Sequence, residues 1–310
     1  MKTLLVGYKA ADLTPQLLEG DVTCHVLDIY HRHAIEKVHH AKAICSPHLP
    51  EGPWDVVKFK TGPKLMSGEL SLDLLQECHR VCARVEVDFV GRERDRNDLL
   101  DKIRKDPNRR RSFRAEWPAS VPGGETLIFA SYPGCFCHRR LDEGGLALAE
   151  VVSRELLVRE KLGMNPDGPL KLLDMGCGCG LVSLLIANRI QTPAFRPDLV
   201  LVDSHSRAVE AATENAARFG LPAEVILADN GTPARMDGTF DVFVGNPPYY
   251  SDYRIAEVFL ETAKRALRPG GVCYTVVKNA VGLKPVQERY FPSVAVIGRR
   301  SYSVLKSVKG

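Results

Sequence analysis

A glycine-rich turn directly follows an apolar run at residues 171–180, which read Lys-Leu-Leu-Asp-Met-Gly-Cys-Gly-Cys-Gly. The apolar run predicts a strand that ends at Asp174, and the leucines at 181, 184 and 185 repeat at the spacing of one helix face. Because glycine has no Cβ, the backbone of such a turn can approach a ligand closely. The helix N-terminus then faces that ligand with unpaired N–H groups and a partial positive charge. The segment therefore predicts a strand, loop and helix that bind a nucleotide-like ligand.

Polar residues also end the next three apolar runs. Asp203 closes the run at 199–203, and Asp229-Asn230 follow the run at 224–228. Asn246 begins an Asn-Pro-Pro-Tyr sequence just after the run at 240–244. The whole set resembles class I S-adenosylmethionine-dependent methyltransferases, in particular those that methylate planar amino or amide nitrogens. The alternative interpretation is a glycine turn in an unrelated α/β fold.

The resemblance implies S-adenosylmethionine as cofactor, and it assigns a part of that molecule to each motif. The glycine loop suits the methionine and sugar portions, and Asp203 can accept hydrogen bonds from the ribose hydroxyls. Asp229 or Asn230 suits the adenine amino group, and the sequence leaves open which of them binds it. The expected cofactor-binding residues are Asp174, Gly176, Cys177, Gly178, Gly180, Asp203, Ser204, Asp229, Asn230 and Asn246.

The sequence Asn246-Pro247-Pro248-Tyr249 is the expected catalytic element. An amino nitrogen conjugated to a ring is a poor nucleophile, so it must be positioned. The Asn246 side-chain oxygen and the Pro247 carbonyl can accept its two N–H bonds and align its lone pair with the methyl group. Proline keeps the turn rigid, and Tyr249 offers a face on which a flat base can stack. The alternative is an ordinary proline turn.

The elements that carry these motifs predict an α/β fold. Apolar runs at 272–277, 293–297 and 302–308 predict three more strands, and the pattern at 255–267 predicts a helix that Pro269-Gly-Gly stops. The expected fold is the Rossmann-like class I methyltransferase fold, with a seven-stranded sheet into which a late antiparallel strand inserts. Residues 113–310 are expected to form this catalytic domain.

Residues 1–112 show a similar order of apolar runs but lack the motifs expected to bind the cofactor and the substrate. Strands are predicted at 3–7, 23–28, 54–59 and 85–90, with a helix at 70–82. The glycine-rich loop is missing after residue 7, and Phe-Lys-Thr-Gly-Pro stands where Asn-Pro-Pro-Tyr would be. We therefore expect a degenerate methyltransferase-like α/β domain that binds no cofactor and has a role in RNA binding or structure. An unrelated α/β domain is the alternative.

Basic residues crowd the stretch between the two halves. We expect RNA phosphates to contact Arg109, Arg110, Arg111, Arg114, Arg139 and Arg140. The alternative is a solvated, charged face.

Further motifs narrow the resemblance to the tandem ribosomal RNA guanine-N2 methyltransferases of the RsmC/RlmG type. The matching positions are Pro133-Gly-x-Phe136, Leu141-Asp142-x-Gly144, Phe240-Asp241, Asn246-Pro-Pro, Gly270-Gly271, Asn279 and Tyr302-x-Val304. The chain departs from that family at Tyr249-Tyr250, where Phe-His is more usual, and in its shorter N-terminal half. The resemblance implies methylation of the guanine 2-amino group, with ribosomal RNA or a ribosomal subunit as partner.

Three alternatives stay open on the sequence alone. Protein-glutamine methyltransferases that act on release factors also carry Asn-Pro-Pro-Tyr, but they have a small helical N-terminal domain. An adenine-N6 nucleic-acid methyltransferase is a second alternative, and a non-catalytic RNA-binding scaffold is a third.

The composition is that of an ordinary globular protein. The 310 residues carry a net charge of +4, with 45% hydrophobic and 26% charged residues. No apolar stretch reaches the roughly 20 residues of a membrane span. The apolar run near the N-terminus is too short for a signal peptide. A cytoplasmic protein without membrane contact is expected; the oligomeric state is open, with a monomer favoured.

Nine cysteines and nine histidines raise the question of a metal site. Cys78 and Cys82 fit the buried face of a helix. Cys135, Cys137, Cys177 and Cys179 form two Cys-x-Cys pairs, which differ from the Cys-x-x-Cys spacing of zinc sites. Free thiols and no metal are expected, with a metal site at these pairs as the alternative. The five histidines between residues 25 and 40 have no regular ligand spacing and are expected mostly at the surface.

Overall fold

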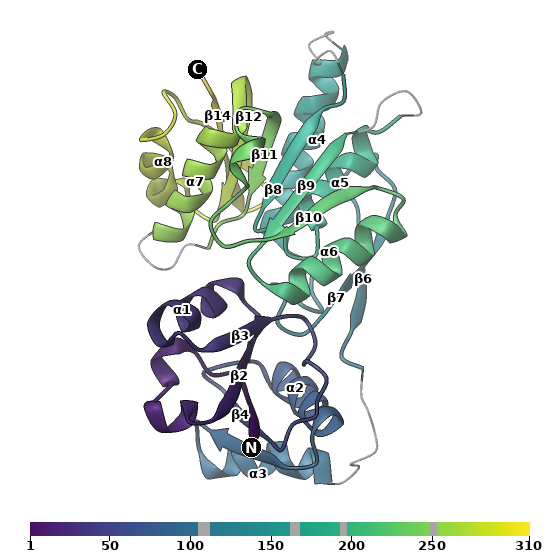
Figure 1. The fold of residues 1–310 in the computed structure, drawn as a ribbon. Helices are drawn as coiled ribbons and strands as arrows, with labels where there is room; N and C mark the ends of the chain where they lie inside the picture. The colour runs from purple at the N-terminus through teal and green to yellow at the C-terminus, as the bar shows by residue number, and fades with distance from the viewer. Residues whose placement is uncertain (105–111, 162–167, 193–196, 249–252) are drawn as a thin grey trace. The chain divides into compact units, whose positions relative to one another are not determined.

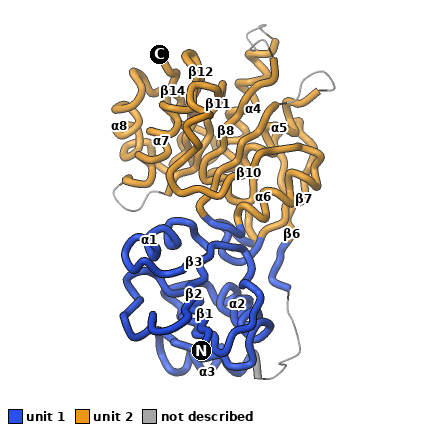
Figure 2. Tube along the Cα trace, in the orientation of Figure 1, with its two compact units in different colours: residues 1–115, 132–138, 205–207 blue, residues 116–131, 139–204, 208–310 orange. Residues whose placement is uncertain are grey.

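The computed structural model describes residues 1–104, 112–161, 168–192, 197–248 and 253–310. The chain divides into two compact units (Figure 2). Unit 1 consists of Met1–Ala115, Tyr132–His138 and His205–Arg207, and unit 2 consists of Glu116–Ser131, Arg139–Ser204 and Ala208–Gly310.

A five-stranded parallel sheet forms the centre of unit 1, in the order β3-β2-β1-β4-β5. Its strands are β1 (Lys2–Val6), β2 (Asp21–Val26), β3 (Lys42–Cys45), β4 (Val56–Thr61) and β5 (Val85–Phe89). Its helices are α1 (Ile29–His39), α2 (Gly68–Val81) and α3 (Glu93–Arg104), with the short 3-10 helices η1 (Ala10–Asp12) and η2 (Pro15–Leu18).

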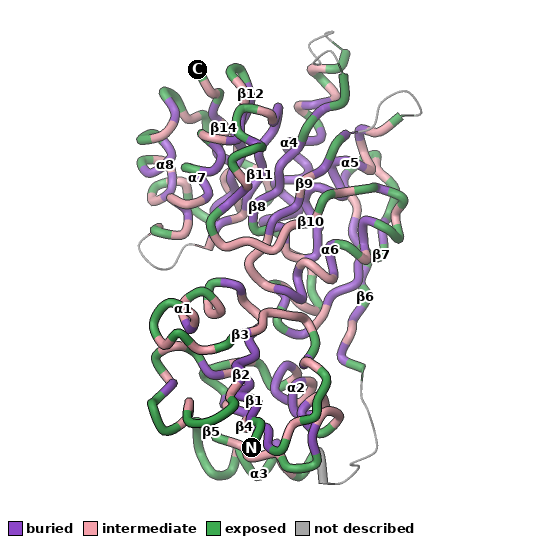
Figure 3. Tube along the Cα trace, viewed as in Figure 1, coloured by how far each residue is buried: buried purple, intermediate pink, exposed green. Residues whose placement is uncertain are grey.

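Unit 1 is covered by helices on both faces of its sheet, because successive residues of a strand point to opposite sides. Leu4 of β1 lies in the same apolar cluster as Leu74 of α2. Leu5, the next residue, lies in a second cluster with Ile35 of α1. All four side chains are almost completely buried, and the central strands β1 and β2 are coloured mostly as buried in Figure 3. Unit 1 is therefore a doubly wound α/β unit.

A seven-stranded sheet forms the centre of unit 2, in the order β10-β9-β8-β11-β12-β14-β13 (Figure 1). Its strands are β8 (Lys171–Met175), β9 (Asp198–Asp203), β10 (Ala223–Leu227), β11 (Phe240–Gly245), β12 (Leu267–Val277), β13 (Ala295–Arg299) and β14 (Tyr302–Val308). The helices around it are α4 (Glu143–Lys161), α5 (Leu181–Ile190), α6 (Ser206–Arg218), α7 (Arg254–Ala266) and α8 (Ala280–Glu288), with the 3-10 helix η3 (Ala234–Met236).

Strand β14 lies between β12 and the edge strand β13 and runs antiparallel to both. All six residues of the central strand β11 are buried, as expected for a parallel strand that helices cover on both faces. The fold class predicted from the sequence is therefore confirmed. The first five strands of this sheet also have the same order as the five strands of unit 1.

A two-stranded sheet of β6 (Ala115–Ala119) and β7 (Leu127–Ser131) precedes α4. Trp117 of β6 stacks on Phe129 of β7, with the ring centroids 5.4 Å apart. Asn215 of α6 then holds β7, since its side chain accepts from the Ala130 N–H at 2.8 Å and donates to the Ala130 carbonyl at 2.9 Å. The sequence-based division of the chain into domains 1–112 and 113–310 stays a prediction.

One sequence-based expectation is wrong in detail, and the expectation that the five histidines lie mostly at the surface has an exception at His25. Helix α7 ends at Ala266 and β12 begins at the next residue, Leu267, so Pro269-Gly-Gly lies inside the strand and does not stop the helix. His25 is 1% exposed, not at the surface, because it lies on a buried strand with its Nε2 2.9 Å from the Ser46 carbonyl oxygen. Burial lowers the pKa of His25 to about 4, so the ring is neutral at pH 7.

The expectation for Cys78 and Cys82 is confirmed, since both lie in the apolar cluster against α2.

Candidate active site

The candidate site lies at the carboxyl ends of β8, β9, β10 and β11, which are parallel neighbours. The register pairs Met175 of β8 with Val202 of β9 on one side and with Gly245 of β11 on the other. The next residue along each strand direction is Gly176, Asp203 and Asn246, respectively. Three of the predicted site residues are therefore brought to one edge of the sheet.

Three glycines of the loop after β8 have a left-handed backbone, with φ of +69° at Gly176, +56° at Gly178 and +83° at Gly180. Side chains with a Cβ rarely adopt this conformation. A Cβ on Gly176 would lie 2.7 Å from the Phe259 ring, whereas a Cβ on Gly178 would have no atom within 4 Å. The loop is thus packed against α7 at its first glycine and open at Gly178, where a ligand can approach the backbone.

Asp203 holds this loop from the end of β9. Its Oδ2 accepts a hydrogen bond from the Gly178 N–H at 2.8 Å. An ionised carboxylate offers about four acceptor positions, so a bond to Gly178 does not by itself exhaust it. This geometry allows the Asp203 carboxylate to shape the loop and also to accept hydrogen bonds from the hydroxyl groups of a bound sugar.

Asp174 of β8 supports the glycine loop and the start of α5. It is 1% exposed, and its Oδ2 accepts from the Ser183 N–H of α5 at 3.2 Å. The N-cap residue of α5 is Gly180, which has no side chain for this purpose, so Asp174 takes over the role of a capping group. Burial, and to a smaller extent the charge of Asp203, raise the pKa of Asp174 to about 7.

Asn246 lies just beyond β11, half-buried, with Pro247 buried beside it. Its Nδ2 donates a hydrogen bond to Oδ2 of Asp142 at 2.8 Å. Asp142 immediately precedes α4, and its Oδ1 accepts from the Gly144 N–H at 3.0 Å. The amide of Asn246 is therefore held from the start of a different helix, 104 residues earlier in the chain.

The family model of the methyltransferase small domain matches residues 126–306, which is more than half of the chain. The chain belongs to this family. The matched stretch contains the glycine loop, the strand ends and Asn246.

Curated proteins with similar sequences are named as methyltransferases. The ribosomal RNA small subunit methyltransferase C of Alcanivorax borkumensis is 34% identical over 156 residues, which are 48% of this chain and 42% of the relative. The protein of the same name from Pseudomonas aeruginosa strain UCBPP-PA14 is 33% identical over 191 residues, 58% of this chain and 52% of the relative. The chain spans about half the length of the curated relatives it matches.

A solved structure matches the whole chain. It is the 16S rRNA N2 G1207 methyltransferase of T. Thermophilus in complex with AdoMet and guanosine, with a TM-score of 0.77 and 19% sequence identity. The match covers 100% of this chain and 88% of that one. At this identity the match supports the fold, including the presence of two α/β units.

Other predicted site residues are placed as follows. Asp229 is half-buried and Asn230 exposed just after β10, so both stay candidates for the adenine contact. Arg139 and Arg140 are exposed, and Arg139 has a left-handed φ of +63°. Tyr249 and Arg109, Arg110 and Arg111 lie outside the described residues.

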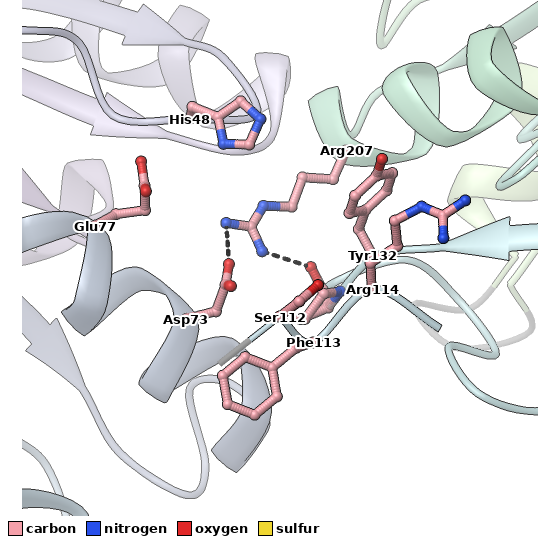
Figure 4. Close-up of a pocket in the computed structure, with 9 residues that line it drawn as sticks. His48, Asp73, Glu77, Ser112, Phe113, Arg114, Tyr132 and Arg207 are labelled. Atoms are coloured by element: carbon pink, nitrogen blue, oxygen red, sulfur yellow. Dashed lines mark hydrogen bonds and ion pairs between the residues drawn. The ribbon is translucent and has the colours of Figure 1, made fainter. Parts of the chain in front are cut away.

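Unit 1 contains a pocket of about 150 Å³ (Figure 4), which Arg114 helps to line. Arg207, 2% exposed, points toward Asp73 in this pocket, with 2.6 Å between its Nη2 and the Asp73 Oδ2. The same guanidinium donates to the carbonyl oxygens of Pro47 at 3.0 Å and Pro133 at 3.1 Å. The buried guanidinium is therefore paired with a carboxylate and hydrogen-bonded to main-chain oxygens within unit 1.

All nine cysteines are free thiols. In the part of the chain that the structure describes, no group of three or more His, Cys, Asp or Glu side chains is arranged to hold a metal ion. Among the same residues, no helix is both long and apolar enough to cross a membrane.

Sequence reasoning missed Asp142 as a site residue, although it lies in the quoted Leu-Asp-x-Gly motif. The available signal was an acidic residue followed by two glycines at the start of a helical pattern. Its contact with Asn246 depends on the tertiary structure alone.

Proposed function

We propose that this chain is an S-adenosylmethionine-dependent N-methyltransferase that modifies the 2-amino group of a guanine in ribosomal RNA. The observation that carries the proposal is the position of Asn246. It stands beside the glycine loop and Asp203 at one sheet edge, with its amide nitrogen already bonded to Asp142. The names of the relatives and of the matched structure point to the same reaction.

The residues present fit this cofactor. The open backbone at Gly178 allows a close approach, and Asp203 can accept the ribose hydroxyls. Bound S-adenosylmethionine supplies an electrophilic methyl group. The chain's own residues would then do the positioning: Asn246 and the Pro247 carbonyl accept the two N–H bonds of the amino group, so the nitrogen lone pair faces the methyl group.

Proton removal requires little from the protein in this reaction. The amino nitrogen becomes acidic as it gains the methyl group, so water can take its proton. The Asp142 carboxyl group, which contacts Asn246, already accepts hydrogen bonds from Gly144 and Asn246. We assign it no role as a general base.

RNA is the proposed partner, and the cytoplasm is the proposed location. Arg114, Arg139 and Arg140, together with the arginines at 109–111, would contact phosphates. The exposed positions of Arg139 and Arg140 support this assignment.

The test supplies methyl-labelled cofactor with ribosomal RNA, ribosomal particles and release factor in parallel, and identifies the product by mass spectrometry. We expect N2-methylguanine in RNA. Methylglutamine in the release factor with unmodified RNA would contradict the proposal and favour the protein-glutamine alternative. N6-methyladenine in RNA would show that the target base is adenine rather than guanine.

A further inference from the structure

The carboxylate of Asp142 joins two segments of unit 2 that are far apart in the sequence. Its main-chain carbonyl accepts from the Leu146 N–H at 2.9 Å, so Asp142 is the residue that caps α4. Its Oδ1 accepts from the Gly144 N–H at 3.0 Å, and its Oδ2 accepts from Nδ2 of Asn246 at 2.8 Å. One side chain thus fixes the beginning of α4 and the end of β11 together.

This arrangement determines which end of the Asn246 amide faces Asp142. An ionised carboxylate can only accept hydrogen bonds, and the two oxygens already face N–H donors. If the amide were reversed, its oxygen would lie against the carboxylate, and two acceptors at hydrogen-bond distance repel each other. The NH₂ group must therefore face Asp142, and the amide oxygen occupies the other branch of the side chain.

We propose that Asp142 is a positioning residue that holds the Asn246 amide with its oxygen toward the substrate, so that the site accepts nucleophiles that carry N–H. This inference rests on the proposed function, and it adds the reason for the selectivity. An amide oxygen can accept from an exocyclic amino group. The same oxygen would repel a ring nitrogen that has only a lone pair, or a carbonyl oxygen.

Burial and hydrogen bonding act in opposite directions on the charge of Asp142. Burial raises the pKa of its carboxyl group, whereas hydrogen bonds from Gly145, Asn246 and Gly144 act in the opposite direction. Burial is the larger effect, so the pKa is raised overall, and the three donors offset part of this shift in favour of the ionised form, which is the form that orients the amide.

Two neighbouring glycines make it possible to move this carboxylate without changing its chemistry. A Cβ added to Gly145 would lie 2.5 Å from the Asp142 Oδ2, the atom that holds Asn246. A Cβ added to Gly144 would lie 3.4 Å from Oδ1, an ordinary contact, and 3.1 Å from the Tyr302 ring. Both glycines are helical, so alanine is favourable for the backbone at each of them.

The experiment compares Gly145→Ala with Gly144→Ala as its matched control, and adds Asp142→Asn. In Asp142→Asn, one of the two acceptor atoms becomes an NH₂ group, so the side chain can no longer accept from both the Gly144 N–H and Asn246. We expect kcat for methyl transfer to ribosomal RNA to fall about 10- to 100-fold in Gly145→Ala and Asp142→Asn, as for other residues that orient a catalytic group. The fall should be much smaller in Gly144→Ala. Cofactor affinity, measured by calorimetry, should stay near the wild-type value in all three.

A spectroscopic readout tests the orientation independently of activity. In protein labelled with ¹⁵N-asparagine, the side-chain NH₂ signal of Asn246 is identified by its absence from Asn246→Ala. We expect this signal to shift and its hydrogen exchange to accelerate in Gly145→Ala and Asp142→Asn, and to change little in Gly144→Ala. A helix cap alone would not alter this signal selectively.

Two results would overturn the inference: equal effects of the two alanine substitutions on kcat, or an unchanged Asn246 signal in folded Asp142→Asn. If Asp142→Asn does not fold, the Gly145→Ala and Gly144→Ala pair decides alone. A wild-type chain that transfers no methyl group to RNA would defeat the proposed function, while the Asn246 signal would still report whether Asp142 holds the amide.

Discussion

Single residues at this site divide their hydrogen-bonding capacity between the protein and a ligand. Asp203 uses one oxygen to hold Gly178, and Asn246 uses its nitrogen to bind Asp142. In each case the contact within the protein fixes the direction of the side chain before any ligand arrives. Such preorganisation is what makes a polar group effective in catalysis, because no reorganisation is needed during the reaction.

The first prediction concerns Asn246. Asn246→Ala removes the acceptor for the amino group, so turnover should fall by roughly 10²-fold or more. Cofactor affinity should change little, because Asn246 acts on the nucleophile. Single-turnover methyl transfer and calorimetric binding measure the two quantities separately. Loss of cofactor binding with normal single-turnover chemistry would show that Asn246 acts on the cofactor instead.

The second prediction concerns Asp174, whose pKa in the folded protein is raised to about 7 from an ordinary value of 3.8. Between these pH values the folded state holds a proton that the unfolded state has lost. The stability contributed by this group is therefore full below pH 4 and is lost as the pH rises through 7. The slope can reach about 1.4 kcal/mol per pH unit.

Asp174→Asn stays neutral and can still accept from the Ser183 N–H. Its free energy of unfolding, measured with urea between pH 5 and pH 8, should therefore fall less with rising pH than that of the wild type. Parallel curves for the two proteins would show that Asp174 is ionised throughout this range.

Much of the site could be predicted at the residue scale because its signals are local. The glycines, Asp203 and Asn246 each follow directly on an apolar run, and a parallel sheet collects the ends of such runs at one edge. Asp142 escaped prediction because its partner lies 104 residues away, and only tertiary packing brings the two together. The capping role of Asp174 was missed for a similar reason, since Gly180 gives no capping signal.

At the scale of elements, continuous apolar runs predicted the buried parallel strands well. The helices α1, α3, α6 and α8 and the strands β3, β6 and β7 were not predicted. Helix α1 is rich in histidine and has only two buried residues, and α8 contains Pro285. The shortest strand, β3, has four residues and lies at a sheet edge. Weak amphipathic patterns and short edge strands depend on their neighbours for stability, so the local sequence carries little signal for them.

The third prediction concerns the contact between α4 and the β13–β14 hairpin. The Glu150 side chain of α4 is 3% exposed, and its carboxylate pairs with Arg299 and, at 2.8 Å, with Arg300. Glu150→Gln keeps the shape but loses the charge, so the free energy of unfolding should fall by about 1–3 kcal/mol. Urea unfolding measures this change. The control is Glu143, an exposed residue that also pairs with Arg300. Glu143→Gln should lower the free energy of unfolding by about 1 kcal/mol or less.

If the two glutamine variants unfold at the same urea concentration, the buried position of Glu150 adds nothing to its ion pairs.

At the scale of the whole chain, the two units share a strand order but differ where a cofactor would bind. In unit 2, β8 leads through the glycine loop into the ten-residue helix α5. In unit 1, β1 leads through Gly7 and the buried Tyr8 into the short helices η1 and η2. A Cβ on Gly7 would lie 2.5 Å from the Lys60 carbonyl oxygen, so the chain itself fills this turn. Unit 1 therefore lacks both the open loop and the long helix N-terminus.

The acid that follows the second strand differs in the same way. Asp203 of unit 2 accepts from the glycine loop, whereas Asp28 of unit 1 accepts from the Tyr30 N–H at 2.8 Å and caps α1. A carboxylate used as a helix cap is directed at its own helix rather than at a ligand beside the sheet. The same topology thus supports a cofactor site in one unit and a structural turn in the other.

The last prediction follows from this difference: the full chain should bind one S-adenosylmethionine, and that site should depend on Asp203. Calorimetry on the intact chain should give a stoichiometry of one. Asp203→Ala should weaken this binding by about 1.5–3 kcal/mol, because the ribose hydroxyls lose a charged acceptor and Gly178 loses its partner. Asp198→Ala, at the exposed start of the same strand, is the matched control and should bind normally. A second site that survives Asp203→Ala with full affinity would mean that unit 1 also binds the cofactor, and that its filled turn opens in solution.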